Sequence, residues 1–199
     1  MAGGPPPFIG LTGGMGAGKS EALAALERLG AATLSTDAVV RELLEGDELR
    51  HELVARFGDQ VAPDGRIDRT AVATLVFEQP DELKWLEGVL WPHVGERVNS
   101  WRQEMSALEP APRALVVEVP LLFEAGMDGV FDHTIAVVAD EQVRSARAAE
   151  RGHAGVESRN TRQLSQQEKA ERAEYVVQND GDLKELEDTL SGLLDNIGL

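Results

Sequence analysis

Cysteine is absent from the sequence of 199 residues, and basic residues are scarce. Without cysteine the chain can form no disulfide and can perform no thiolate chemistry. The 19 basic residues face 35 acidic ones, so the formal net charge is −16. This charge repels a polyphosphate backbone and argues against general nucleic-acid binding, although a local basic pocket can still hold a small anion.

Long apolar runs are also missing. The most apolar stretch, residues 114–123, is interrupted by Glu118 and Pro120, and it is much shorter than the roughly 20 residues that span a bilayer. Residues 1–7 contain neither a basic segment nor a long apolar core, so we interpret them as a flexible lead-in and not as a signal peptide. These features fit a cytoplasmic location and no membrane partner.

Short apolar runs alternate with segments of helical periodicity. Runs that predict strands lie at 8–12, 32–36, 115–119, 134–138 and 175–177. Buried strands separated by helices are typical of a parallel sheet with helices on both faces. The sequence therefore predicts a three-layer α/β/α fold with a sheet of about five strands.

Several helices can be placed between these strands. The first is expected at 20–29, and residues 38–57 read as two helices divided near Gly46. Asp68 is expected to cap another helix. A further helical region begins at Pro80, and Pro92 inside it is expected to break or kink it.

The C-terminal third has its own helix signals. Asp140 is expected to cap a helix through Arg151, and Ser165 with Glu168 has the form of a capping box. The last helix is expected at 182–194. Its inward face is expected to carry Leu183, Leu186, Leu190 and Leu194.

The segment from Gly13 to Ser20 has the spacing Gly-x-x-x-x-Gly-Lys-Ser of a phosphate-binding loop. Its glycines let backbone N–H groups point into one concavity, where the following helix presents its positive end. Lys19 can then reach the β- and γ-phosphates, and the Ser20 hydroxyl can ligate Mg²⁺. The segment follows a predicted strand and opens a predicted helix, which favours this interpretation over a glycine-rich turn without a ligand.

A loop of this kind occurs in GTPases, ATPases and small-molecule kinases. The Asn-Lys-x-Asp segment that reads guanine is absent from the sequence, which favours ATP and a kinase. Two alternatives stay open. One is a kinase for another small acceptor, such as a nucleoside monophosphate, and the other is a nucleotide-dependent switch that binds a protein partner through residues 38–110.

Two acidic residues stand at predicted strand ends, which face the ligand crevice in a parallel sheet. Asp37 can accept a proton from an attacking hydroxyl, help to organise Mg²⁺, or cap the helix after it. Glu118 is expected to act on the metal or to be a half-buried structural acid. The residues after Pro120 can line an apolar wall for a substrate, although such residues are normally core: Leu121, Leu122 and Phe123.

Arginines gather in the predicted helix after residue 140. Arg144, Arg147 and Arg151 share a helical face, and Arg159 and Arg162 follow. Such a face is often only solvated. Because guanidinium groups match phosphate oxygens, however, a lid that closes over the phosphate loop is the second interpretation.

Taken in order, several of these segments resemble the dephospho-CoA kinase family. The resemblance runs from about residue 8 to residue 190, and the segment Glu-Val-Pro-Leu-Leu-Phe-Glu is its most specific part. The matching segments are 9–20, 36–38, 64–69, 118–124, Arg159-x-x-x-Gln163, Glu168-Lys169 and Asn179-x-Gly181. Trp91-Pro92 stands where the family usually has His-Pro, so we assign no role to His93.

The resemblance implies transfer of a phosphoryl group from ATP to the ribose 3′-hydroxyl of dephospho-CoA, which gives CoA and ADP in the last step of coenzyme A biosynthesis. It also implies a P-loop, nucleoside-kinase-like fold. Its parts are expected to be a core (about 8–37, 111–140 and 173–199), a helical insertion on the substrate side (about 38–110) and a lid (about 141–172).

The resemblance also implies roles for individual residues. Asp37 is the expected base, and Lys19 and Arg147 assist catalysis. Ser20 and Glu118 are the expected ligands of Mg²⁺, and Asp37 with residues 121–123 is expected to contact the acceptor. The expected ATP-binding residues are Gly14, Met15, Gly16, Ala17, Gly18, Lys19, Ser20, Glu21, the lid arginines Arg147 and Arg151, and, near the adenine, Asn179 and Gly181.

Overall fold

The computed structural model describes residues 4–77, 79–150 and 163–197. These residues form two compact units. The larger unit contains the described residues up to Ser35 and from Arg102 onward, and the smaller unit is Thr36–Trp101. In the described part of the chain, no helix is long and apolar enough to cross a membrane.

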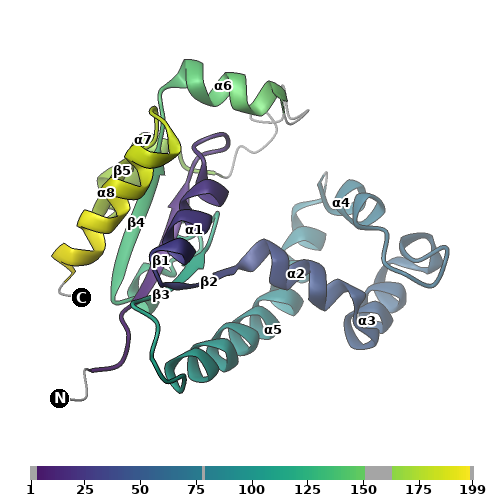
Figure 1. Cartoon of the computed structure of the whole chain (residues 1–199). Helices are drawn as coiled ribbons and strands as arrows, with labels where there is room; N and C mark the ends of the chain where they lie inside the picture. Colours follow the sequence, from purple (N-terminus) through teal and green to yellow (C-terminus); the bar gives the residue numbers. More distant parts are fainter. Residues whose placement is uncertain (1–3, 78, 151–162, 198–199) are drawn as a thin grey trace. The chain divides into compact units, whose positions relative to one another are not determined.

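Helices and strands alternate along the chain (Figure 1). In chain order they are β1 (Phe8–Gly13), α1 (Lys19–Arg28), β2 (Ala32–Ser35), α2 (Thr36–Glu45), α3 (Asp47–Phe57), the 3-10 helix η1 (Asp59–Val61), α4 (Arg69–Phe77), α5 (Pro80–Ser106), β3 (Leu115–Glu118), the 3-10 helix η2 (Asp128–Val130), β4 (His133–Val138), α6 (Glu141–Glu150), α7 (Gln166–Arg172), β5 (Tyr175–Gln178) and α8 (Leu183–Asn196).

The larger unit is built on a parallel sheet with strand order β2-β3-β1-β4-β5. β1 lies at its centre and is buried along its whole length, with Ile9 opposite Val116 of β3 and His133 of β4. Each of the five predicted strands is present within one residue at either end. The predicted α/β fold class is confirmed.

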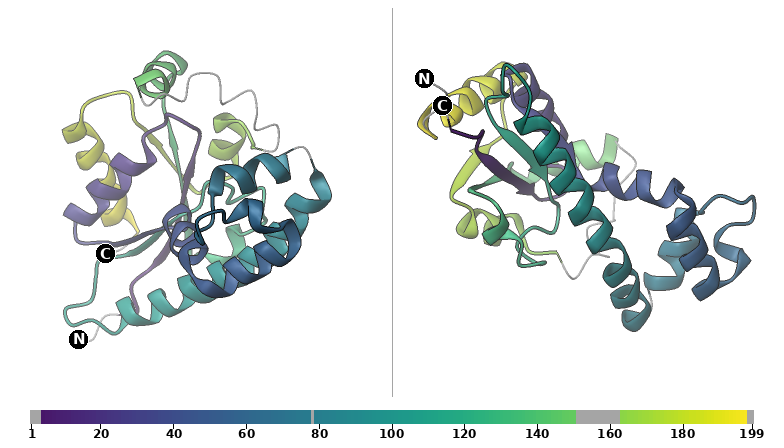
Figure 2. Two further views of the ribbon diagram at one scale, coloured as in Figure 1. Left: turned by 90° about the vertical axis from the view of Figure 1, so that its right-hand side faces the viewer. Right: turned by 90° about the horizontal axis from the view of Figure 1, so that it is seen from below.

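Helices cover both faces of this sheet. α1 and α8 lie side by side on one face, where Leu26 and Leu190 join Leu11 of β1 in an apolar cluster (Figure 2). Neighbouring strand residues point to opposite faces, so Thr12 faces the other side. There α7 packs against β1 and β4, and its Lys169 reaches Thr12. The end of β1 is therefore enclosed from both faces.

The smaller unit is helical, as its sequence predicts. α2 and α3 are separated at Gly46, and leucines and valines from α2 to α5 share one core. Asp68 caps α4 by accepting the Thr70 N–H at 2.9 Å. The unit spans 36–101, whereas we expected an insertion of about 38–110. The difference arises because α5 is a single helix whose last residues, from Arg102, belong to the larger unit.

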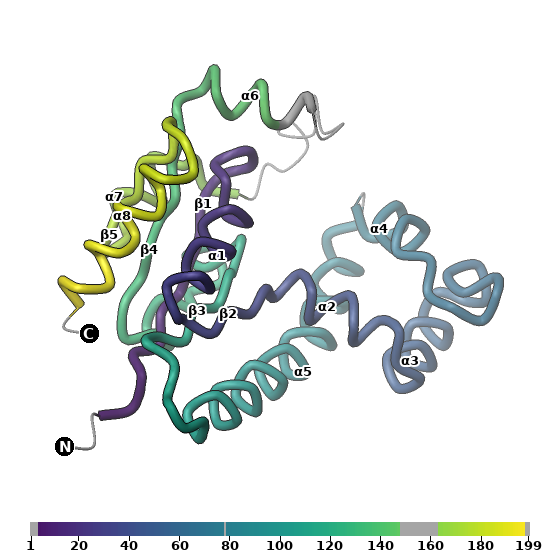
Figure 3. Tube along the Cα trace, viewed as in Figure 1, coloured from purple at the N-terminus to yellow at the C-terminus, as the bar shows by residue number. Residues whose placement is uncertain are grey.

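The expected break at Pro92 is wrong. α5 is one helix through this residue, and its trace runs on without interruption (Figure 3). Pro92 is exposed, while Leu90 and Val94 on either side of it are buried. Proline has no N–H group, so the helix lacks one backbone hydrogen bond at Pro92. We attribute its continuity to the buried stripe, whose packing stabilises the helix on both sides of this position.

The predicted capping box of Ser165 and Glu168 on α7 is confirmed. Asp182 caps α8 by accepting the Lys184 and Glu185 N–H groups, which the sequence analysis did not predict. Leu183, however, is 59% exposed and not inward. It is the first residue of α8, one turn before the stretch that packs on the sheet from Leu186 onward.

A buried polar junction joins α7 to the ends of β1 and β3. The Lys169 ammonium, fully buried, lies 3.0 Å from Glu124 Oε1 and 3.4 Å from Thr12 Oγ1, and it also donates to the Pro120 carbonyl. Glu124 Oε1 accepts the Leu164 N–H at 2.8 Å. Burial lowers the pKa of Lys169, and the hydrogen bond and charge of Glu124 oppose this shift. The junction thus holds three chain segments together beside the phosphate loop.

We expect Lys169→Met to lower the free energy of unfolding by about 3–5 kcal/mol, because it leaves the Glu124 carboxylate buried without its cation. Urea denaturation measures this change. The matched control is Lys184→Met, since Lys184 forms an exposed ion pair with Asp188, and there we expect a change within about 0.5 kcal/mol.

The double variant Lys169→Met/Glu124→Gln is expected to recover most of the loss. It removes the unpaired charge and keeps an oxygen that can accept the Leu164 N–H. Equal losses in Lys169→Met and Lys184→Met would contradict a special role for the buried pair.

Candidate active site

The candidate site is centred on the loop between β1 and α1. Gly16 and Gly18 have φ values of 75° and 92°, a region that favours glycine. A Cβ atom on Gly18 would lie 2.0 Å from Asn179 Nδ2, and one on Gly16 would lie 2.6 Å from the Arg144 carbonyl oxygen. The two glycines therefore allow the loop to lie directly against α6 and the segment after β5.

Lys19 folds back over this loop. Its Nζ donates to the Gly13 carbonyl at 3.0 Å and to the Gly14 carbonyl at 3.1 Å. The two carbonyl groups hold the ammonium group of Lys19 at the loop. Ser20 follows in the first turn of α1 and is exposed, so its hydroxyl is accessible. This geometry can hold the phosphates of a nucleotide.

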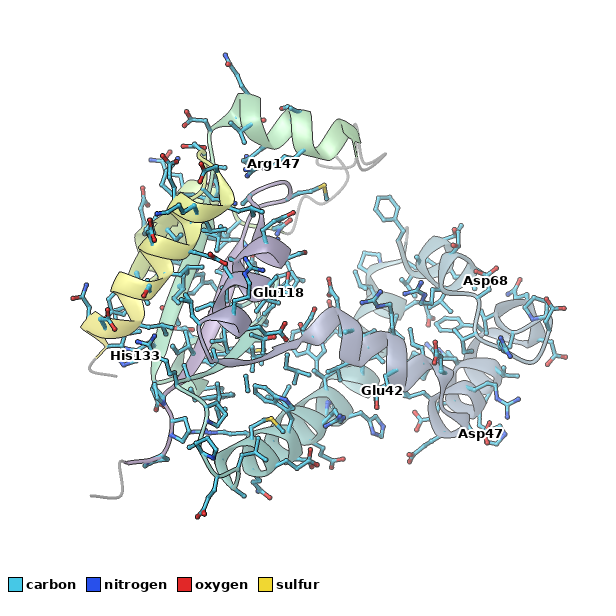
Figure 4. All side chains as sticks on the ribbon, in the orientation of Figure 1. Glu42, Asp47, Asp68, Glu118, His133 and Arg147 are labelled. Atoms are coloured by element: carbon cyan, nitrogen blue, oxygen red, sulfur yellow. The ribbon has the colours of Figure 1, made fainter. Side chains whose placement is uncertain are left out.

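The structure brings Arg147 and Asn179 together at the same loop. The Asn179 side chain donates to the Ala17 carbonyl at 2.9 Å, and Arg147 Nη1 donates to the Asn179 carbonyl at 2.9 Å. Figure 4 shows Arg147 on α6, which follows β4. Gly181 lies two residues beyond Asn179 and is exposed. Two of the residues expected near ATP, Arg147 and Asn179, thus meet at the phosphate loop.

A second contact ties the start of α6 to this segment. The Asp140 N–H, which immediately precedes α6, donates to Asp180 Oδ1 at 2.6 Å. This hydrogen bond is the main reason why the pKa of Asp180 is lowered. A carboxylate that stays ionised fixes the short segment between β5 and α8, and with it the position of Asn179.

Glu118 is the last residue of β3, the strand next to β1. It is buried, and its register partner on β1 is Leu11. The following N–H, of Val119, donates to the Leu11 carbonyl at 2.8 Å. Glu118 therefore lies at the carboxyl end of the sheet, one strand away from the loop.

The three residues of the expected apolar wall differ in burial. Leu122 is fully buried, and its Cδ1 lies 2.6 Å from the position that a Cβ on Gly10 would take. Phe123 is also buried, whereas Leu121 is half-buried. Leu122 fills the space under the glycine of β1 as a core residue, and Leu121 is the most accessible of the three.

Asp37 belongs to the smaller unit. α2 begins at Thr36, so Asp37 lies inside its first turn and not one residue before a helix that starts at 38. Its side chain is exposed. Arg151, Arg159 and Arg162 lie outside the described residues. Within the described residues, no cluster of three or more histidine and acidic side chains has the arrangement of a metal site.

Sequence reasoning gave no individual role to three residues that the structure places beside the loop. Arg144 contacts the loop directly, with Nε donating to the Met15 carbonyl at 2.9 Å. The sequence indicates it only as a member of the arginine face that it shares with Arg147. Lys169 and Glu124 support the end of β1, and the sequence indicates them only as parts of matching segments, because nothing in the local sequence shows that they form a buried pair.

Comparison with known proteins identifies the family. A family profile for dephospho-CoA kinase matches residues 7–185. The dephospho-CoA kinase of Moorella thermoacetica is 38% identical over 182 residues, which cover 89% of this chain and 85% of the relative. That of Thermus thermophilus is 37% identical over 192 residues, which cover 95% of this chain and 91% of the relative.

Solved structures agree with this fold. A crystal structure from Thermus thermophilus is 34% identical, with a TM-score of 0.82 over 98% of this chain and 99% of that one. The dephospho-CoA kinase from Campylobacter jejuni, 21% identical, has a TM-score of 0.68 over 96% of each chain. A shikimate kinase from Bacteroides thetaiotaomicron, 15% identical with a TM-score of 0.54, shares the fold. By its profile match and its relatives, the chain belongs to the dephospho-CoA kinase family.

Proposed function

We propose that this protein transfers the γ-phosphoryl group of ATP to the ribose 3′-hydroxyl of dephospho-CoA, giving CoA and ADP. The observation that carries the proposal is the phosphate loop at the end of the central strand, in a chain of this family. The absence of the guanine-reading segment from the sequence supports ATP as the donor.

On the donor side, the loop amides from Gly14 to Ser20 bind the phosphates. Lys19 exchanges its carbonyl partners for phosphate oxygens, and Arg147 adds a second cation from α6. Glu21 lies in the first turn of α1, next to the phosphate loop, and its charge does not favour a phosphate. Arg151 is proposed as a second lid arginine. Asn179 and Gly181 lie beside the adenine, since Asn179 already packs against the loop.

Mg²⁺ prefers oxygen ligands, and the hydroxyl of Ser20 and the carboxylate of Glu118 at the same edge of the sheet fit this preference. When bound, Mg²⁺ neutralises charge on the transferring phosphoryl group. Ser20 is accessible, as a ligand to a nucleotide-bound ion must be.

On the acceptor side, Asp37 orients the 3′-hydroxyl and takes its proton. β2 ends at Ser35, two residues before Asp37, and the carboxyl ends of parallel strands share one edge of the sheet. The side chain is exposed, and a carboxylate can act as a base. Leu121 is the apolar contact that we retain for the acceptor. The acceptor is a small molecule, and we propose a cytoplasmic location for the reaction.

Purified protein with MgATP is expected to release ADP only when dephospho-CoA is present, and the acceptor is expected to gain the mass of one phosphate. Coupled ADP detection and mass spectrometry measure the two products. Binding of ATP without any acceptor-dependent ADP would contradict the proposal.

A panel of nucleoside monophosphates tests the alternative small-molecule kinase. We expect dephospho-CoA to be preferred in kcat/KM over each member of the panel. Slow ATP hydrolysis with no acceptor at all would instead favour a nucleotide-dependent switch.

Asp37→Asn is expected to lower kcat by about 10²–10⁴-fold, because the amide cannot accept the hydroxyl proton. The free energy of unfolding should change little, since the side chain is exposed. The matched control is Asp81→Asn, an exposed acid in the first turn of α5, which should keep the parent kcat. Near-normal turnover of Asp37→Asn would overturn its assignment as the base.

A further inference from the structure

We infer that Arg144 of α6 is a positioning residue for the phosphate loop: it holds the Met15 carbonyl outward and so aims the Gly16 N–H at the bound phosphates. The inference rests on the proposed nucleotide site and adds to it a residue whose role is to shape the loop.

Arg144 touches three successive residues of the loop. Its Nε donates to the Met15 carbonyl at 2.9 Å, and its Nη2 lies 3.3 Å from the position of a Cβ on Gly14. Its own carbonyl oxygen would lie 2.6 Å from a Cβ on Gly16. The side chain is only 12% exposed and is also paired with Glu141 at 2.8 Å. The guanidinium group is therefore fixed in place before any nucleotide arrives.

The effect on the loop follows from the planarity of the peptide bond. In a trans peptide the carbonyl of one residue and the N–H of the next point in opposite directions. A partner that holds the Met15 carbonyl therefore also sets the direction of the Gly16 N–H. Arg144 lies outside the loop on α6, so the Gly16 N–H points to the opposite side, into the concavity that receives phosphate.

The peptide group between Ala17 and Gly18 is oriented in the same way. The buried Asn179 side chain donates to the Ala17 carbonyl at 2.9 Å, which orients the Gly18 N–H. Asn179 is in turn fixed through its backbone, which donates to Val138 at 2.8 Å and accepts from Arg147 at 2.9 Å. α6 thus acts on the loop twice, directly through Arg144 and indirectly through Arg147 and Asn179.

Lys19 acts on the first part of the loop and Arg144 on its middle. Lys19 holds the Gly13 and Gly14 carbonyls from within the loop. The peptide group between Met15 and Gly16 needs a hydrogen-bond partner outside the loop. The glycines on either side of Met15 restrict the rotation of this peptide group only weakly. Loss of Arg144 should therefore loosen one phosphate donor while the rest of the site keeps its shape.

The test compares Arg144→Met, Arg144→Gln and a control, Arg172→Met. Arg172 is an exposed arginine in the last turn of α7, in the same unit. Titration calorimetry measures ADP binding, and steady-state kinetics measure KM for ATP and KM for dephospho-CoA. Urea denaturation reports the free energy of unfolding for each variant.

For Arg144→Met we expect ADP binding to weaken about tenfold and KM for ATP to rise by a similar factor, as the loss of a hydrogen bond from a charged donor implies. KM for dephospho-CoA and kcat should stay within about twofold, since the loop alone is affected. Arg144→Gln should recover much of the ADP affinity, because its amide can still donate to the Met15 carbonyl. Arg172→Met should match the parent.

Three results would overturn the inference. Unchanged ADP affinity in Arg144→Met excludes the positioning role. Equal increases in both KM values indicate a general structural role. A loss in Arg144→Gln as large as in Arg144→Met indicates that the charge contacts phosphate directly. If the parent protein binds no ADP, the proposed function is wrong. If the parent binds ADP but does not phosphorylate dephospho-CoA, the proposed function is also wrong, but the ADP affinities of the Arg144 variants still test the inference.

Discussion

The larger unit depends on one constraint, which is that all five of its strands run parallel. Parallel pairing puts every carboxyl end at one edge of the sheet, so segments far apart in sequence meet there. β1 has partners on both sides and is buried throughout, and the chain leaves it directly into the glycine loop. The central strand is thus the most rigid support available for a loop whose backbone must bind phosphate.

Polar groups at this edge lie close to a buried interior, where a polar group without a partner costs free energy. Lys169 is the extreme case, with a lowered pKa and contacts to Glu124, Thr12 and Pro120. The side chain of Asn179 is also buried, and it donates a hydrogen bond to the Ala17 carbonyl. In both cases the need to satisfy a buried group also fixes a segment of the site. Stability and preorganisation of the site therefore have the same physical origin.

Much of the fold could be predicted from the sequence, because its signals are local. Strand limits, the capping box at Ser165 and the cap at Asp68 depend on residues a few positions apart. The expected break at Pro92 and the inward position of Leu183 failed because tertiary packing, which local sequence does not contain, decided both. For the site, the glycine spacing located the loop, but the contact between Arg144 and Met15 joins residues 129 positions apart.

Charge is the remaining problem for a protein that binds polyanions. The chain carries a formal net charge of −16, so its long-range field opposes a nucleotide. Salt screens that field beyond about 8 Å at physiological ionic strength, and local groups then decide the affinity. Lys19 donates to two carbonyl groups of the phosphate loop, and Arg147 donates to the carbonyl of Asn179, whose side chain contacts the same loop. These contacts hold two cations at the loop although the chain as a whole is acidic. The positive charge that phosphate needs is therefore supplied locally, where salt has screened the long-range field.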